Sequence, residues 1–252
     1  MAEPTTTDPL RTKCRPIVRA GEGWTGILRD AFPRNRYGIV PVTLQLVRAP
    51  FKTIFRLADD PAYGNYWTLL LAITGITIVL LYVTLPYIFN LLVGQELVTV
   101  ASDGQRLRMK FQLTQFAALI VSTPAQYYAF RAVSPISRSP RSYVKMAVLG
   151  NCYNLLIRIA FGLLALVVGV IVTYARLPMH MSTGIAIEFA LATLCNIVVA
   201  YELHRRFWQI PWWKTLALMS VFLLIATYLI GPQLTHMAEG LDQFDSQAVF
   251  GR

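Results

Sequence analysis

The longest stretch without a charged residue is the feature that most constrains the fold of this chain. No Asp, Glu, Lys or Arg occurs between Asp60 and Glu96, and most of that stretch is apolar. A helix needs about 20 apolar residues to cross the roughly 30 Å of hydrocarbon in a bilayer. Residues 67–93 meet this requirement and are predicted as a first span, which Pro86 is expected to kink. Only 14% of the chain is charged, against roughly 25% in soluble domains, so we expect an integral membrane protein.

Four further segments are predicted to cross the membrane. Two of them, residues 111–130 and 215–234, contain no charge at all. The other two, residues 146–174 and 181–201, are long enough, but each contains one ionisable residue. The predicted fold class is therefore all-α: a polytopic membrane helix bundle of about five transmembrane helices, preceded by an amphipathic interfacial helix.

The same pattern divides the chain into four parts. Residues 1–43 mix Thr, Pro, Gly and charge without the apolar core of a signal peptide, and are expected to form a mostly irregular cytoplasmic segment. Residues 44–60 are predicted as the interfacial helix, and residues 61–235 as the five-helix transmembrane domain. Residues 236–252 are predicted to be a short outward-facing tail.

The segment before the first span combines apolar and basic faces. Apolar residues recur at helical spacing through residues 44–58, and Arg48, Lys52 and Arg56 occupy the other side. Pro50 fits a helix that begins there, because a proline at the first helical position loses no needed donor. Such a helix lies on the inner leaflet with its cations among the headgroups. An elbow packed against the first span is the alternative, and the two arrangements are compatible.

The distribution of Lys and Arg predicts the orientation. The loops on one side carry roughly twice as many cations as those on the other, and cytoplasmic loops are the richer side. We therefore expect the N-terminus inside and the C-terminus outside. The excess of Arg (18) over Lys (5) fits a GC-rich bacterial genome, so the expected location is a bacterial inner membrane. This account also explains the net charge of +10 without a nucleic-acid partner. The residues expected to contact anionic headgroups or a partner are Arg48, Lys52, Arg56, Arg138, Arg141, Lys145, Arg205 and Arg206.

Ionisable residues inside spans are costly and are candidates for function. Asn151, Asn154 and Arg158 fall at i, i+3 and i+7 on one helix face, and Glu188 in the fourth span is the natural counter-charge at similar depth. An Arg–Glu clamp that fixes helix register is favoured over a transport or headgroup site and over a snorkelling arginine. The predicted intramembrane polar cluster is Arg158, Glu188, Asn151, Asn154, Asn196 and Gln126.

Signatures of catalysis and metal binding are absent from the sequence. His180, His204 and His236 lie in different regions, and no CxxC, GxSxG, Walker or GxGxxG pattern occurs. The adjacent Asp59 and Asp60 lack the second acidic motif that a magnesium–diphosphate site needs, so they are interpreted as a helix-ending turn. We expect a non-enzymatic protein with no cofactor and no metal.

Two loop-and-span segments combine tyrosine, arginine and aromatic residues in a set order. Residues 143–162 (YVKMAVLGNCYNLLIRIAFG) begin a span with a polar, tyrosine-containing turn. Residues 201–224 (YELHRRFWQIPWWKTLALMSVFLL) place Tyr-x-x-x-Arg-Arg-aromatic before the last span. In both segments the chain resembles the Yip family of five-span membrane proteins, over about residues 51–235. The resemblance implies a non-enzymatic protein with a cytosolic N-terminus. Residues 1–40 lack the acidic-tyrosine motif of the GTPase-binding eukaryotic members, so GTPase binding is not expected.

Two function hypotheses follow from these observations. The leading one is a scaffold or accessory subunit that binds anionic lipid, and another membrane protein or a second copy of itself, through its basic cytoplasmic face. The alternative is a small transporter or channel that uses Arg158 and Glu188. A lipid-modifying enzyme, dependent on Asp59 and a metal, is a third and weaker hypothesis.

Overall fold

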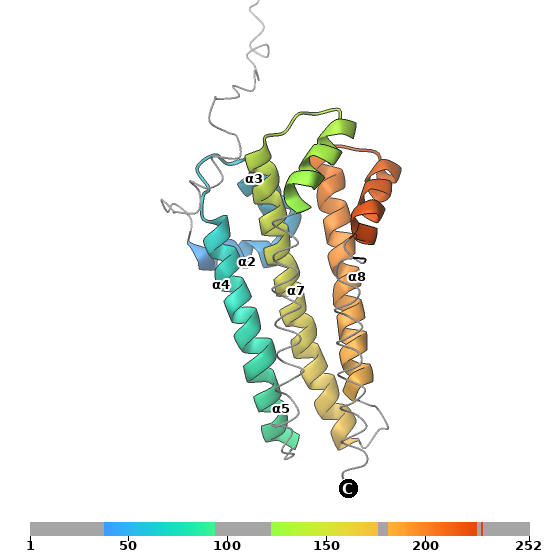
Figure 1. Cartoon of the computed structure of the whole chain (residues 1–252). Coiled ribbons are helices and arrows are strands. Elements are labelled where there is room, and N and C mark those ends of the chain that lie inside the picture. Colours follow the sequence, from blue (N-terminus) through green and yellow to red (C-terminus); the bar gives the residue numbers. More distant parts are fainter. Residues whose placement is uncertain (1–37, 94–121, 176–180, 226–227, 229–252) are drawn as a thin grey trace, which may run out of the picture.

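The protein is a bundle of long helices that is capped at one end by shorter ones (Figure 1). The computed structural model describes residues 38–93, 122–175, 181–225 and 228. Every regular element in these residues is helical, which confirms the all-α part of the predicted fold class. The elements are α2 (Ile39–Arg48), α3 (Pro50–Asp59), α4 (Tyr66–Val79), the π-helical turn η1 (Leu80–Thr84), α5 (Leu85–Val93), a helix at 122–133, α7 (Pro140–Tyr174), α8 (Met181–Trp208) and the helix Trp212–Ile225.

Helix α7 lies at the centre and packs against α3, α4, α5 and α8. When α4, η1 and α5 are taken separately, α7 is the one helix among the described residues that is long and apolar enough to cross a membrane by itself. Only 17% of its most apolar 18-residue window is buried inside the protein. Leu164, Val168 and Ile171 accordingly face outward. The core helix of a soluble protein would instead be mostly buried.

The start of α7 is fixed by a capping pair. The Ser139 hydroxyl accepts a hydrogen bond from the Ser142 backbone N–H at 3.1 Å, and Pro140 occupies the first turn. Both residue types are preferred at these positions, because they meet or remove an otherwise unsatisfied donor. The helix therefore begins six residues before the predicted span at residue 146, and its first turns belong to the capped end.

Helices α4 and α5 are joined without a break through η1. A wider π turn directly precedes Leu85 and Pro86, and the Thr84 hydroxyl donates to the Val79 carbonyl at 3.1 Å. Pro86 has no N–H to offer the preceding turn, and such turns absorb the missing bond. The continuous helix from Tyr66 to Val93 is on the order of 40 Å long at about 1.5 Å per residue.

The predicted interfacial segment forms two helices rather than one. The chain turns at Ala49, with φ −148° and ψ 70°, and α3 begins at Pro50, as its position in the sequence allows. Ile54 is buried against the bundle, whereas Leu44 is exposed. The segment therefore combines the packed and the outward-facing arrangements.

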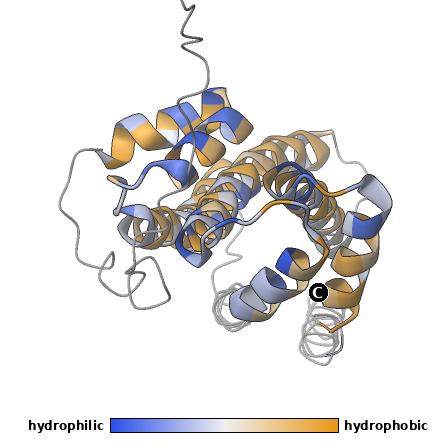
Figure 2. Cartoon of the chain, turned by 90° about the horizontal axis from the view of Figure 1, so that it is seen from above, coloured by the Kyte–Doolittle hydropathy of each residue, from blue (hydrophilic) through white to orange (hydrophobic). Residues whose placement is uncertain are grey.

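The largest fully buried side chains lie at the capped end. Tyr127, Tyr143, Phe207 and Trp208 are fully buried there, and the rings of Tyr127 and Tyr143 both lie 5.6 Å from that of Trp208. Seen from this end, hydrophilic residues lie mainly on the nearest helices and loops, and the long helices behind are mainly hydrophobic (Figure 2). Several predicted regions lie outside the described residues. They are residues 1–37 of the N-terminal segment, the tail at residues 236–252, and parts of the second and fifth spans.

Candidate functional site

Arg138 binds three elements of the capped end at once. Its Nη1 lies 2.7 Å from Asp59 Oδ1, and its guanidinium lies 5.0 Å from the centre of the Phe207 ring. Its backbone carbonyl accepts the Tyr127 hydroxyl at 2.9 Å. The side chain is 29% exposed, so it anchors the loop before α7 while leaving part of its charge at the surface.

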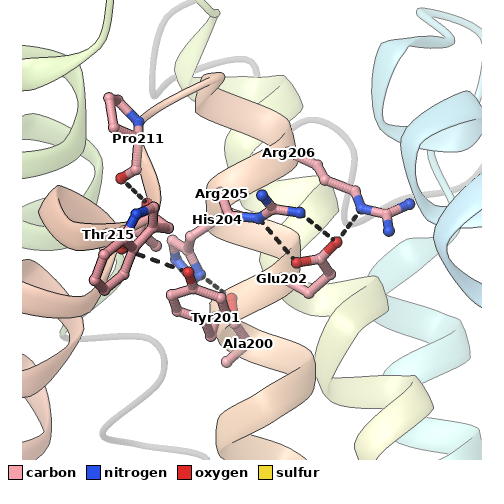
Figure 3. A network of polar contacts seen from close by, with 9 residues as sticks. Ala200, Tyr201, Glu202, His204, Arg205, Arg206, Pro211 and Thr215 are labelled. Carbon is pink, nitrogen blue, oxygen red and sulfur yellow. Dashed lines mark hydrogen bonds and ion pairs between the residues drawn. The ribbon is translucent and has the colours of Figure 1, made fainter.

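The end of α8 carries a second arginine cluster (Figure 3). Glu202 accepts hydrogen bonds from both Arg205, at 3.0 Å, and Arg206. These hydrogen bonds hold the pKa of the Glu202 carboxyl below its usual range, and the bond from Arg205 has the largest effect. Arg206 also lies 5.1 Å from the centre of the Phe51 ring, which links α8 to α3. The cluster keeps one net positive charge at the surface.

Three predicted headgroup residues lie on the outer side of α2 and α3. Arg48, Lys52 and Arg56 are exposed, and Arg56 donates to the Gln45 side chain. Arg141, at the start of α7, lies 3.5 Å from the Pro61 carbonyl. These four cations therefore gather at the same end of the bundle as Arg138 and the Glu202 cluster.

Lys145 is buried and does not lie on the predicted basic face. Its side chain is only 1% exposed, and its Nζ donates to the Asp60 carbonyl at 2.7 Å. Helix α3 and the turn after it cover this part of α7, which no local sequence pattern indicates. The prediction that Lys145 contacts headgroups is therefore wrong, and the residue ties the Asp60 turn to α7 instead.

Gln126 lies in a buried hydrogen-bonded network at the capped end, separate from Arg158. The Tyr143 hydroxyl lies 3.1 Å from Gln126 Oε1 and 3.0 Å from His204 Nε2. His204 Nδ1 donates to the Ala200 carbonyl at 2.7 Å. Burial lowers the pKa of His204 from 6.5 to about 4 and raises the pKa of Tyr143, so both side chains are neutral near pH 7.

The register between α4 and α7 locates Arg158, which is 7% exposed. The two helices run in the same direction (Figure 1). Three contacts connect α7 to the continuous helix formed by α4, η1 and α5. In each contact the two residue numbers differ by 80 to 82: Gly162 with Leu81, Gly169 with Phe89, and Tyr174 with Leu92. This offset puts Arg158 level with Thr77, which is fully buried and donates to the Ile73 carbonyl.

The register between α7 and α8 places two asparagines at a similar level along the bundle. Because these helices are antiparallel, two residues at the same level have a constant sum of residue numbers. In the observed contacts this sum lies between 347 and 353: Tyr143 with His204, Tyr143 with Phe207, and Gly150 with Leu203. The middle of this range puts Asn154 level with Asn196, and the range itself spans about one helical turn on either side. Asn151 lies about one turn nearer the capped end and is half-buried.

Glu188 lies farther along the bundle than Arg158. The same register puts its backbone roughly 6 Å farther from the capped end. The side chain of Glu188 lies outside the described residues, so its pairing with Arg158 stays a prediction.

Three buried oxygen atoms mark a polar layer in the middle of the bundle. Asn154 Oδ1, Asn196 Oδ1 and Thr74 Oγ1 have no hydrogen-bond partner among the described residues. The α4–α7 offset puts Thr74 level with residue 155, one position along α7 from Asn154. Leaving a buried polar group unsatisfied costs about 1–3 kcal/mol. We call Thr74, Asn154, Asn196 and Arg158 the polar layer.

The sequence prediction missed several of these residues. Tyr143 and His204 carry no local motif, because their contact joins residues 61 positions apart. Thr74 and Thr77 were open to prediction, since they are polar residues at i and i+3 in an apolar helix. Within the described ranges, no group of His, Cys, Asp or Glu is arranged to hold a metal ion. No family model matches the chain, and no curated protein or solved structure is detectably similar to it.

Proposed function

We propose that the chain is an integral membrane protein whose five helices cross the bilayer. The observation that carries this proposal is the outward-facing apolar surface of α7, whose most apolar window is only 17% buried. Exposed apolar side chains continue the same surface on the neighbouring helices, for example Val83 after α4, Leu194 on α8 and Leu224 in the last helix. In water this surface would be unfavourable, whereas lipid chains solvate it.

The charge distribution supports an orientation with the capped end in the cytoplasm. Apart from Arg158, the described cations lie in α2 and α3, at residues 131–145 or at residues 205–214, all at the capped end. Lysine and arginine are enriched in cytoplasmic loops and contact anionic lipid there. This arrangement agrees with the predicted location in a bacterial inner membrane.

Helix α2 supports contact between the capped end and the membrane surface. It lies across the bundle axis (Figure 1), and Val40, Leu44 and Val47 form an exposed apolar stripe along it. Lys52 and Arg56 on the neighbouring α3 are exposed as well. A helix that lies in the plane of the membrane combines these two features.

We therefore propose a non-enzymatic scaffold or accessory subunit that binds anionic lipid, and a membrane-protein partner or a second copy, through the capped end. Native mass spectrometry of the full-length protein from nanodiscs that contain phosphatidylglycerol tests the lipid part. Replacing Arg48, Lys52 and Arg56 by Gln is expected to reduce the number of retained anionic lipids. Unchanged retention would contradict the proposal. The Lys145→Met variant is the matched control, because its side chain is buried.

A small transporter or channel is the second candidate, and the polar layer is the observation that favours it. In this case Arg158→Gln would abolish flux of the substrate while the variant still folds. If the variant instead fails to accumulate, the structural role of Arg158 is favoured. A charge swap with Glu188 that restores accumulation would support the predicted clamp.

A further inference from the structure

The polar layer lies away from the basic capped end. Asn154 is 11 residues along α7 from Tyr143, which is roughly 16 Å at about 1.5 Å per residue. Its oxygen atom and those of Asn196 and Thr74 are buried and accept no hydrogen bond within the described part of the chain. Buried polar atoms in folded proteins almost always have a partner, either protein or ordered water.

The side chains of the polar layer determine which kind of ligand could bind there. Two amides and a hydroxyl offer oxygen atoms that accept hydrogen bonds, and the guanidinium of Arg158 one turn away offers only donors. A ligand that contacts both kinds of group must donate and accept hydrogen bonds itself. Ala192 lies level with Arg158 on the facing side of α8, where its small side chain adds little bulk. The close approach of Gly150 to Leu203 limits the space one turn above.

We propose that the polar layer is a hydrated site that binds water or a small uncharged hydrogen-bonding solute in the middle of the bundle. Water donates to the orphaned oxygen atoms and accepts from a guanidinium, and a buried water makes about three such bonds. The site deepens the second candidate function, and it rests on the proposed placement of the bundle across a membrane. It does not depend on what the capped end binds.

Cysteine accessibility tests this proposal on the full-length protein in liposomes. Asn196→Cys is compared with Leu194→Cys, which lies on the same helix but is 59% exposed on the apolar surface. Both variants are made in a background in which Cys14, Cys152 and Cys195 are replaced by Ala. A thiol reacts as the thiolate, which forms in water and not in hydrocarbon. We expect methyl methanethiosulfonate, an uncharged reagent, to modify the cysteine at 196 at least about tenfold faster than the one at 194.

The two ways in which the proposal can fail are distinguishable. Equally slow modification at both positions would overturn the hydrated site and leave the membrane placement intact. Fast modification at 194 would contradict the membrane placement, and the proposal would fall with it. Circular dichroism and size-exclusion chromatography check that each variant is folded.

A second measurement keeps the proposal falsifiable if Asn196→Cys does not fold. Thr74→Val removes one orphaned oxygen without changing the shape of the side chain. In a hydrated layer it removes a water contact and lowers the unfolding midpoint, whereas in a dry layer it removes an unsatisfied group and raises the midpoint. Thr77→Val is the control, since that hydroxyl bonds the carbonyl of its own helix at 2.7 Å. A Thr74→Val variant at least as stable as the wild type would overturn the proposal.

Discussion

The Tyr143 hydroxyl lies 3.0 Å from His204 Nε2 and joins the start of α7 to the end of α8. Since His204 Nδ1 donates to the Ala200 carbonyl, Nε2 of neutral His204 is an acceptor, and it shares the Tyr143 hydroxyl with Gln126 Oε1. Phe130 packs over the imidazole with ring centres 4.6 Å apart. This enclosed pair fixes where the two helices meet, and burial keeps His204 uncharged near pH 7 by lowering its pKa.

Stability is expected to fall as the pH drops from about 6.5 to 4. The pKa of His204 is lowered from 6.5 to about 4 in the folded protein, so in this range the unfolded chain takes up a proton that the folded protein does not. The loss from this residue reaches roughly 3 kcal/mol near pH 4 and then stops, because both states are protonated below that value. Unfolding in mild detergent, followed by circular dichroism at several pH values, measures the loss. The His204→Asn variant is expected to show a flatter dependence, and an equal slope in both proteins would contradict the assignment.

Gly150 is expected to resist substitution, because a methyl group there would lie 2.6 Å from Leu203 Cδ1. Gly150→Ala should lower the free energy of unfolding by about 1 kcal/mol through overpacking between α7 and α8. Gly75→Ala is the matched control, since nothing lies within 4 Å of its added methyl group and alanine favours the helix. Combining Gly150→Ala with Leu203→Ala should cost less than the sum of the single changes. Strict additivity would argue against the contact.

Lys145 and Lys52 are expected to behave in opposite ways, although both were predicted to contact headgroups. Lys145→Met leaves the Asp60 carbonyl without its 2.7 Å donor and should lower stability by about 1–3 kcal/mol, with anionic lipid retention unchanged. Lys52→Gln should leave stability within about 0.5 kcal/mol of the wild type and reduce lipid retention, since its side chain is exposed. Thermal unfolding and native mass spectrometry of the same preparations separate the two effects. The reverse pattern would contradict the assigned positions.

The long helices were predictable from the sequence, whereas the contacts between them were not. The charge-free run that contains residues 67–93 marks α4, η1 and α5, because apolar length is a local property. The burial of Lys145 and the network around Tyr143 arise from residues distant in sequence, which no spacing rule brings together. Among the candidate site residues, Asn154, Arg158 and Asn196 were predicted as parts of one polar cluster, but Thr74 on α4 emerged only from the helix register.

The central claim is that α7 crosses a membrane with the capped end inside, and thiol labelling at its two ends tests this most directly. Ser137→Cys before the helix and Ala175→Cys after it are both exposed positions, and both substitutions are small. In intact cells that express either variant without Cys14, Cys152 and Cys195, an impermeant maleimide is added from outside. The account predicts that the cysteine at 175 is labelled, while the one at 137 is labelled only after the cells are permeabilised. Labelling of both from outside, or of neither, would contradict a membrane-spanning α7.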